Sequence, residues 1–170
     1  TIEGNGSYTV TSADGLMHVA DLVNGGKTDI NITLDKNIDL TGKGWTPIGT
    51  SFDNSYTGTF DGGGYTIRGL RVSKRSYYNS NNEGFDEGNH AGLFVKLSGA
   101  TVKNLTVTGY VDGRFYVGGI AGYADDTTKL LNCRNECIVV SSQSTYPYVS
   151  DPESVIRYAG GIVGYNAGSV

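Results

Sequence analysis

The side chains best suited to glycan cleavage are a few aspartates and one arginine. Polysaccharide-cleaving β proteins use clustered carboxylates or a basic residue on one face, and the candidates here are Asp61, Asp112, Asp125, Asp126 and Arg114. Asp61 is followed by three glycines and Asp112 by one, and turn geometry alone accounts for aspartates in such sequences. Asp125 and Asp126 lack the spacing of a calcium-binding loop, so solvated loop charges are the simpler interpretation. We therefore predict no enzyme, and a glycan-active lyase or hydrolase stays the alternative.

Histidine and cysteine form no recognisable metal or nucleophile site. His18 falls in a predicted helix and His90 ends a polar segment, and neither has an identified carboxylate or nucleophile partner. Cys133 and Cys137 are the two cysteines, and no further cysteine or histidine pair completes the four ligands of a zinc site. A disulfide between them requires Cα atoms within about 7 Å, and free thiols are the simpler alternative. We predict no cofactor and no metal.

Aromatic side chains concentrate in three turn-rich segments, residues 75–90, 113–116 and 141–157. Such residues suit sugar rings or a protein partner, because they supply apolar area and tyrosine adds a hydroxyl group. The alternative is that these rings fold back and cover the flank of the molecule. The candidate ligand-binding residues are Tyr77, Tyr78, Phe85, Arg114, Phe115, Tyr116, Tyr146 and Tyr148.

Each aromatic segment precedes one copy of a repeated phrase within residues 91–170. The motifs at 92–95, 119–122 and 161–164 share glycine and apolar residues, and 102–111 aligns with 130–139 at a constant offset. Repeats of this length are typical of solenoids, whose units bury their apolar faces only by stacking. The segments 75–90 and 141–157 are then loop insertions that emerge from one edge of the stack.

The pattern of apolar residues predicts one helix followed by short strands. Leu16, Val19, Ala20 and Val23 share one face of a helix over about residues 12–24, with Ser12 or Asp14 as its N-cap. Alternating stretches of three to five residues follow. We predict an all-β fold, a right-handed parallel β-helix or β-solenoid, in which the helix caps the N-terminal end.

Parallel stacking of the copies makes specific predictions about residue columns. Equivalent residues lie about 4.8 Å apart, so Leu93, Ile120 and Ile162 form one buried column, and glycines occupy corners where a side chain would collide. Asn104 lies over Asn132, where the two amides can form a ladder.

Composition narrows the partners and the setting of the chain. Its 170 residues carry a formal net charge of −4 without a basic cluster, so nucleic acid is not an expected partner. No segment approaches the roughly 18 apolar residues that span a bilayer, so we predict no membrane insertion. The chain starts at Thr1 and its third repeat stops at Val170. We expect one domain cut from a longer polypeptide with further domains, or an end that a partner covers.

The repeats resemble the GLUG-motif repeats of bacterial surface proteins, found in adhesin-like proteins of gut Bacteroidales and in IgA-specific metallopeptidases of streptococci. The three motifs carry the resemblance, and "WTPIG" and "GTFDGGGYTIRGL" look like the segment that commonly precedes them. The first copy departs from the pattern, with Val95 and Lys96 where Gly-Tyr stands in the other two. The resemblance implies a secreted or cell-surface location and adhesion, and no HExxH peptidase signature is present.

These observations together predict a noncatalytic extracellular repeat domain of a bacterial surface protein. Its loop-rich aromatic edge would bind a glycan or a host surface protein. A glycan-active enzyme and a structural spacer are the alternatives.

Overall fold

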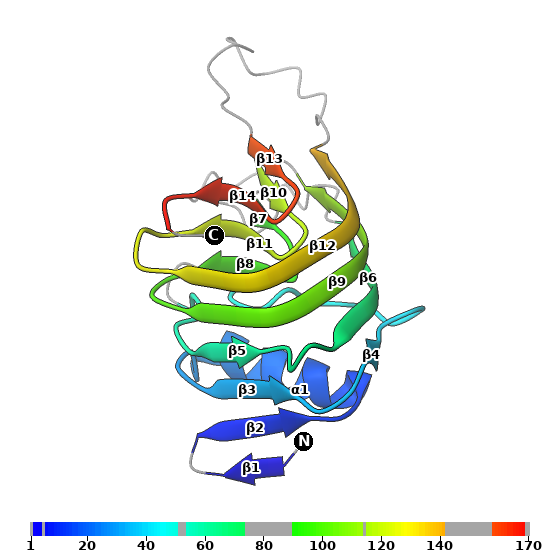
Figure 1. The fold of residues 1–170 in the computed structure, drawn as a ribbon, viewed down its shortest axis with the longest axis vertical. Coiled ribbons are helices and arrows are strands. Elements are labelled where there is room, and N and C mark those ends of the chain that lie inside the picture. Colours follow the sequence, from blue (N-terminus) through cyan, green and yellow to red (C-terminus); the bar gives the residue numbers. More distant parts are fainter. Residues whose placement is uncertain are drawn as a thin grey trace, which may run out of the picture.

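The protein is a stack of parallel β-coils with one α-helix near its N-terminal end (Figure 1). Among the residues that the structure describes, every strand pair except β1–β2 is parallel, which gives a solenoid-like arrangement of the kind that the repeats predict. A computed structural model describes residues 2–4 (main chain only), 6–50, 54–73, 90–113, 115–141 and 158–168.

The helix α1 (Ala13–Asn24) confirms the predicted helix and follows from the same residues, but strand β1 (Ile2–Gly4), not the helix, pairs with the first strand edge. Ser12 caps its start, where the side-chain oxygen accepts a hydrogen bond from the Gly15 N–H at 3.1 Å. Leu16, Val19 and Val23 are fully buried in the core. The helix lies behind β3 (Asn31–Leu34), and the outer edge of the first coil is paired by β1, which runs antiparallel to β2 (Ser7–Val10).

The largest sheet has eight strands and forms the broad face in Figure 1. Its order is β1-β2-β3-β5-β9-β6-β4, with β12 paired to β9. Strands β5 and β6 lie in one coil and pair with successive parts of the long strand β9. The remaining strands of this sheet are β4 (Ile38–Asp39), β5 (Thr59–Asp61), β6 (Thr66–Ser73), β9 (Thr101–Gly113) and β12 (Lys129–Ser141).

The prediction of uniformly short strands is wrong for β9 and β12, which have 13 residues each. Both contain an asparagine in the left-handed region, Asn104 at φ 53° and Asn132 at φ 51°. Asparagine tolerates this conformation better than most residues. Bends at equivalent positions let the two strands turn together and keep pairing from Lys129 with Thr101 to Ser141 with Gly113.

Two three-stranded sheets complete the later coils. One contains β7 (His90–Ala91), β10 (Tyr116–Gly118) and β13 (Tyr158–Gly160), and the other contains β8 (Phe94–Leu97), β11 (Ala121–Ala124) and β14 (Val163–Asn166). In this register the Phe94 N–H donates to the Ile120 carbonyl and the Ile120 N–H donates to the Ile162 carbonyl, at 2.8 and 3.0 Å. The predicted register of Leu93, Ile120 and Ile162 is therefore confirmed, and Leu93 and Ile120 are buried, whereas Ile162 is half-buried.

Columns of stacked apolar residues form the core. Strand pairing places Ile32, Phe60, Val102 and Leu130 one above another, and all four are buried. The ring of Phe94 lies 5.5 Å from both Phe60 and Tyr56, which adds an aromatic cluster. Within the described residues, no helix is long and apolar enough to cross a membrane.

Candidate functional site

The repeated glycines bring two strands of one coil into close contact. Strand β10 ends at Gly118, and the chain folds back through Gly119 and Ile120 into β11. A Cβ atom at Gly122 would lie 2.8 Å from the Tyr116 carbonyl oxygen and 2.9 Å from the Ala91 main-chain nitrogen. The expectation that a side chain would collide here is confirmed.

The predicted reason for the glycines, however, needs correction. Gly118, Gly119 and Gly122 have no positive φ, so the backbone conformation does not require glycine. Gly118 and Gly122 are needed because the main chains of neighbouring strands approach too closely for any side chain between them, whereas a side chain at Gly119 would collide with that of Asn135.

Two columns of aromatic side chains stand beside this glycine contact. His90, Tyr116 and Tyr158 stack in one column, with ring centroids 4.6 and 5.5 Å apart. Tyr123 and Tyr165 stack in the other at 5.1 Å, with the Lys96 ammonium 5.5 Å from the Tyr123 ring centroid. We call these five aromatic residues, together with Lys96, the aromatic ladder.

The two columns of the aromatic ladder interlock through perpendicular ring contacts. Tyr116 meets Tyr123 and Tyr165 at 6.3 and 5.6 Å, with interplanar angles of 78° and 70°. Such edge-to-face pairs are favourable beyond the area they bury. The faces of Tyr116 are covered by His90 on one side and by Tyr158 on the other, so this ring cannot stack on a sugar.

The hydroxyl groups are the part of the aromatic ladder that can meet a ligand. In the described ranges, Trp45 Nε1 is the sole buried side-chain nitrogen or oxygen without a hydrogen-bond partner. The hydroxyls of Tyr116, Tyr123 and Tyr165 bond to no described residue and are therefore not completely buried, and all three residues are half-buried. Because Tyr123 stacks on Tyr165 at 5.1 Å, their hydroxyls recur along the stack at about the strand spacing, and each can donate and accept.

The environment of the aromatic ladder holds His90 in its neutral form. Burial of the imidazole, with the charge of Lys96 nearby, lowers the pKa of His90 to about 4. A neutral ring stacks on Tyr116 without a desolvated charge, so the ladder is intact at neutral pH.

The structure places only part of the predicted binding residues. Phe115 is half-buried, and its carbonyl oxygen accepts a hydrogen bond from the Tyr158 N–H at 2.6 Å. Tyr116 was assigned to a loop but begins strand β10. The remaining candidates lie outside the described residues: Tyr77, Tyr78, Phe85, Arg114, Tyr146 and Tyr148.

Sequence reasoning missed four of the aromatic rings. Tyr123 and Tyr165 follow the glycine motif, whereas the search for aromatic residues concentrated on the segments before it. His90 and Tyr158 are paired with Tyr116 in the strand register. Aligned positions contained part of the signal, because Tyr116 and Tyr158 each stand three residues before their motif, whereas His90 stands two residues before its own.

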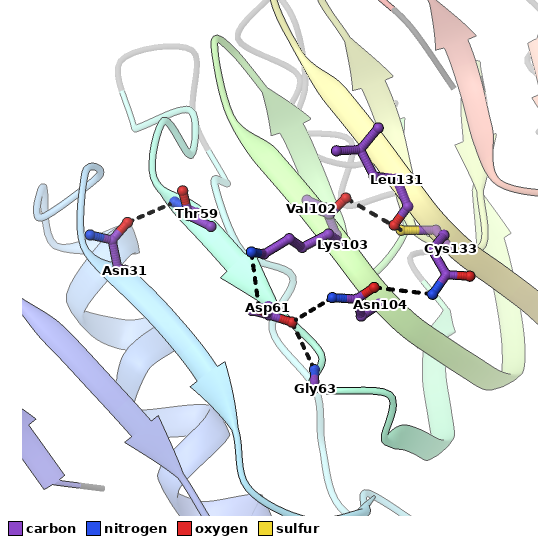
Figure 2. Close-up of polar contacts among 10 residues, drawn as sticks. Asn31, Thr59, Asp61, Gly63, Val102, Lys103, Asn104, Leu131 and Cys133 are labelled. Carbon is purple, nitrogen blue, oxygen red and sulfur yellow. Dashed lines mark hydrogen bonds and ion pairs between the residues drawn. The ribbon is translucent and has the colours of Figure 1, made fainter.

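The predicted asparagine ladder is confirmed and extends one coil further. Asn132 Nδ2 donates to Asn104 Oδ1 at 3.0 Å, and Asn104 Nδ2 donates to Asp61 Oδ1 at 3.1 Å (Figure 2). Asp61 also accepts from the Gly63 N–H and pairs with Lys103 at 3.2 Å. We call Asp61, Asn104 and Asn132 the amide ladder.

Replacing Asn104 with alanine is expected to lower the free energy of unfolding by about 1.5 kcal/mol, since alanine is strained at positive φ and two hydrogen bonds are lost. Asn104→Gly removes the same bonds without the strain and is expected to cost about half as much. Urea denaturation followed by circular dichroism measures both values. Equal losses for the two variants would exclude a contribution from backbone strain.

Asp61 and Asp125, two of the candidate catalytic carboxylates, hold turns. Partial burial raises the pKa of Asp61, but bonds from Gly63, Asn104 and Lys103 outweigh it and lower the pKa overall. The same balance at Asp125, with bonds from Ser98, Gly99, Thr127 and Thr128, holds its pKa well below the usual range. Both groups therefore stay ionised, whereas a general acid needs a raised pKa.

The cysteines lie on one strand and are free thiols. Extended residues four apart in β12 are separated by about 13 Å, which exceeds the span of a disulfide. The Cys133 thiol instead donates to the Val102 carbonyl at 3.4 Å. Among the described residues, no three histidine, cysteine, aspartate or glutamate side chains form a group that could hold a metal ion.

The fold and these columns define a solenoid-like, parallel β protein. No protein-family model matches the chain. A solved structure from Bacteroides ovatus, which carries the provisional name immunoglobulin A1 protease, superposes with a TM-score of 0.55 at 20% identity over 79% of this chain and 48% of that one. At this identity the likeness supports the fold alone. The GLUG resemblance stays a prediction.

The chain is also similar in sequence to an archaeal protein. Halomucin from Haloquadratum walsbyi is 31% identical to the chain over 112 residues, which is 51% of this chain and 1% of halomucin. The chain thus spans about half of the solved Bacteroides protein and a very small part of halomucin. It resembles segments of much longer bacterial and archaeal proteins.

Proposed function

We propose that the chain is a noncatalytic segment of a large extracellular surface protein, built as a right-handed parallel β-helix, that binds a glycan or a host protein through its aromatic edge. The observation that carries this proposal is the row of unburied tyrosine hydroxyls in the aromatic ladder. The similarity to a small part of a very long protein supports a role as one segment of such a protein. The hydrogen bonds by which Asp61 and Asp125 hold turns weigh against an enzyme.

The stacked geometry defines how such a ligand would be held. The ring faces of Tyr116 are occupied by neighbours, so binding would depend on hydrogen bonds to the hydroxyls and on the Lys96 ammonium. A glycan suits this surface because its own hydroxyl groups are both donors and acceptors. The other candidate binding residues precede the same motifs in the sequence and would extend the surface: Tyr77, Tyr78, Phe85, Arg114, Tyr146 and Tyr148.

Removing hydroxyls without disturbing the rings tests the proposal. The double variant Tyr116→Phe, Tyr123→Phe keeps every stacking contact, and each lost hydrogen bond of about 1 kcal/mol is expected to weaken binding roughly fivefold. Glycan arrays and immobilised mucin identify the ligand, and titration then gives Kd. Tyr110→Phe is the matched control, because Tyr110 lies on β9 beside Arg71 and outside the ladder.

The outcomes separate a binder from a spacer. Loss of affinity in the double variant with an unchanged Tm supports recognition by the hydroxyls. A wild-type chain that binds no glycan or mucin, or a double variant that binds as well as wild type, contradicts the proposal and favours a structural spacer.

A further inference from the structure

The C-terminal end of the stack is less covered than the coil beneath it, position by position. Leu105, Val111 and Ile120 are almost completely buried. The residues stacked directly above them, Cys133, Val139 and Ile162, are only half-buried, although they face the same interior. Strand β12 pairs with β9 along one edge, and no described strand pairs with its other edge.

One glycine position shows the missing neighbour directly. A Cβ atom at Gly119 would collide with the Asn135 side chain of β12, the next long strand of the stack. Gly161 occupies the same motif position one coil later, and a Cβ atom there would meet no atom within 4 Å. The space that Asn135 fills over Gly119 is open over Gly161.

All hydrogen bonds of the amide ladder point the same way, and Asp61 sets this orientation. An ionised carboxylate only accepts hydrogen bonds, so Asn104 must turn its NH₂ group toward Asp61 and its oxygen toward Asn132. Asn132 must then turn its NH₂ toward Asn104, which leaves its own Oδ1 as an acceptor. No described residue donates to this oxygen. One end of the amide ladder is the Asp61 carboxylate, which needs no further partner. The other end is Asn132 Oδ1, which can accept a hydrogen bond from one more donor.

We propose that this end binds one further parallel coil of the same polypeptide, with a side-chain N–H donor over Asn132 and apolar residues over Cys133 and Val139. The added strand would pair with β12 as β12 pairs with β9, in parallel and in the same register. The next coil of the same chain meets this requirement directly, so a second copy of the chain fits less well. The proteins that this chain resembles extend well beyond the matched segment, which is what a further coil on the same polypeptide would require. This inference is independent of ligand binding at the aromatic ladder.

The chain provides its own probe for the proposed coil. Residues 159–168 align with 117–126, so a copy of residues 129–141 appended after Val170 continues the repeat in register. Both cysteines in the copy are replaced by valine, so Cys133 and Cys137 remain the only thiols. Their labelling with a thiol reagent then reports directly whether the end is covered.

The extension is expected to slow the labelling of Cys133 and Cys137 by at least about tenfold and to raise Tm, because the thiols would react only after the added strand opens. Replacing the ladder asparagine in the appended copy with leucine is expected to reverse part of both effects. Gly161→Ala gives a second readout, since it should be neutral in the original chain and destabilising once the added copy of Asn135 lies above it.

Controls distinguish coverage from added length. An extension of identical composition in scrambled order should label at the rate of the original chain. Equal labelling rates for the ordered and scrambled extensions would overturn the proposal. So would dimerisation of the original chain in sedimentation, if its thiols became protected as concentration rose, because a second copy would then occupy the end.

Discussion

Replacing Gly118 with alanine is expected to lower the free energy of unfolding by about 3 kcal/mol and Tm by roughly 10 °C. The new Cβ atom would collide with the Ala121 carbonyl oxygen. It would also lie 2.7 Å from both the Ile162 carbonyl oxygen and the Gly164 main-chain nitrogen. All three neighbours are main-chain atoms held in sheet pairs, so none can rotate away as a side chain would. Relief requires β10 and β11 to separate.

Gly161→Ala is the matched control for this variant. Gly161 belongs to the repeated motif, Gly118 directly precedes one copy of it, and neither glycine has a positive φ. With no atom within 4 Å of the new Cβ, its change in stability should stay within about 0.5 kcal/mol. Urea denaturation and scanning calorimetry compare the two. Similar losses would mean that the glycines act through backbone freedom and not through close strand contact.

Sequence alone predicts the parts of this fold that repeat. Aligned glycine motifs gave the register of Leu93, Ile120 and Ile162, and a constant offset placed Asn104 beneath Asn132. The prediction worked because parallel stacking sets each residue against its own equivalent, so similar residues recur where the environment recurs. Helix α1 was predictable for a local reason, since its capping serine and apolar period lie within one short segment.

Features without a repeated counterpart were not predictable in this way. Strand β1 reverses direction to pair with β2, and no equivalent coil exists to compare it with. The length of β9 depends on pairing that continues around the bend at Asn104, which alternation of apolar residues does not reveal. The closeness of β10 and β11 is likewise a tertiary property, so the glycines read as turns in sequence.

The candidate site illustrates the same limit for side chains. Tyr116 was predicted as part of a binding edge from its place in an aromatic segment, yet its ring faces are covered by residues 26 and 42 positions away. Local composition identified an aromatic surface but not which atoms it exposes. Because both faces of the Tyr116 ring are covered, only its hydroxyl group can contact a ligand. Substitution by phenylalanine, which removes the hydroxyl and keeps the ring, is therefore the test of binding.

Acidification from pH 7 to pH 5 is expected to remove about 2 kcal/mol of stability through His90 alone. Its folded-state pKa of about 4 lies below the unfolded value of about 6.5. Between these values the unfolded chain binds a proton that the folded chain does not, so stability falls as pH falls. The loss begins near pH 6.5 and is complete near pH 4. Above about pH 6.5 the imidazole is neutral in both states, so it does not lower the stability.

His90→Phe isolates this effect, because phenylalanine keeps an aromatic ring over Tyr116 and cannot take up a proton. Between pH 7 and pH 5 the variant should lose about 2 kcal/mol less stability than wild type. Below this range Asp39, whose pKa is lowered to about 2 chiefly by hydrogen bonds from Thr41, and Asp125 add losses common to both proteins. Lys96→Gln should reduce the wild-type loss, since the nearby positive charge helps to depress the pKa of His90. Parallel stability curves for wild type and His90→Phe would show that the imidazole is solvated, and that the aromatic ladder does not hold it neutral.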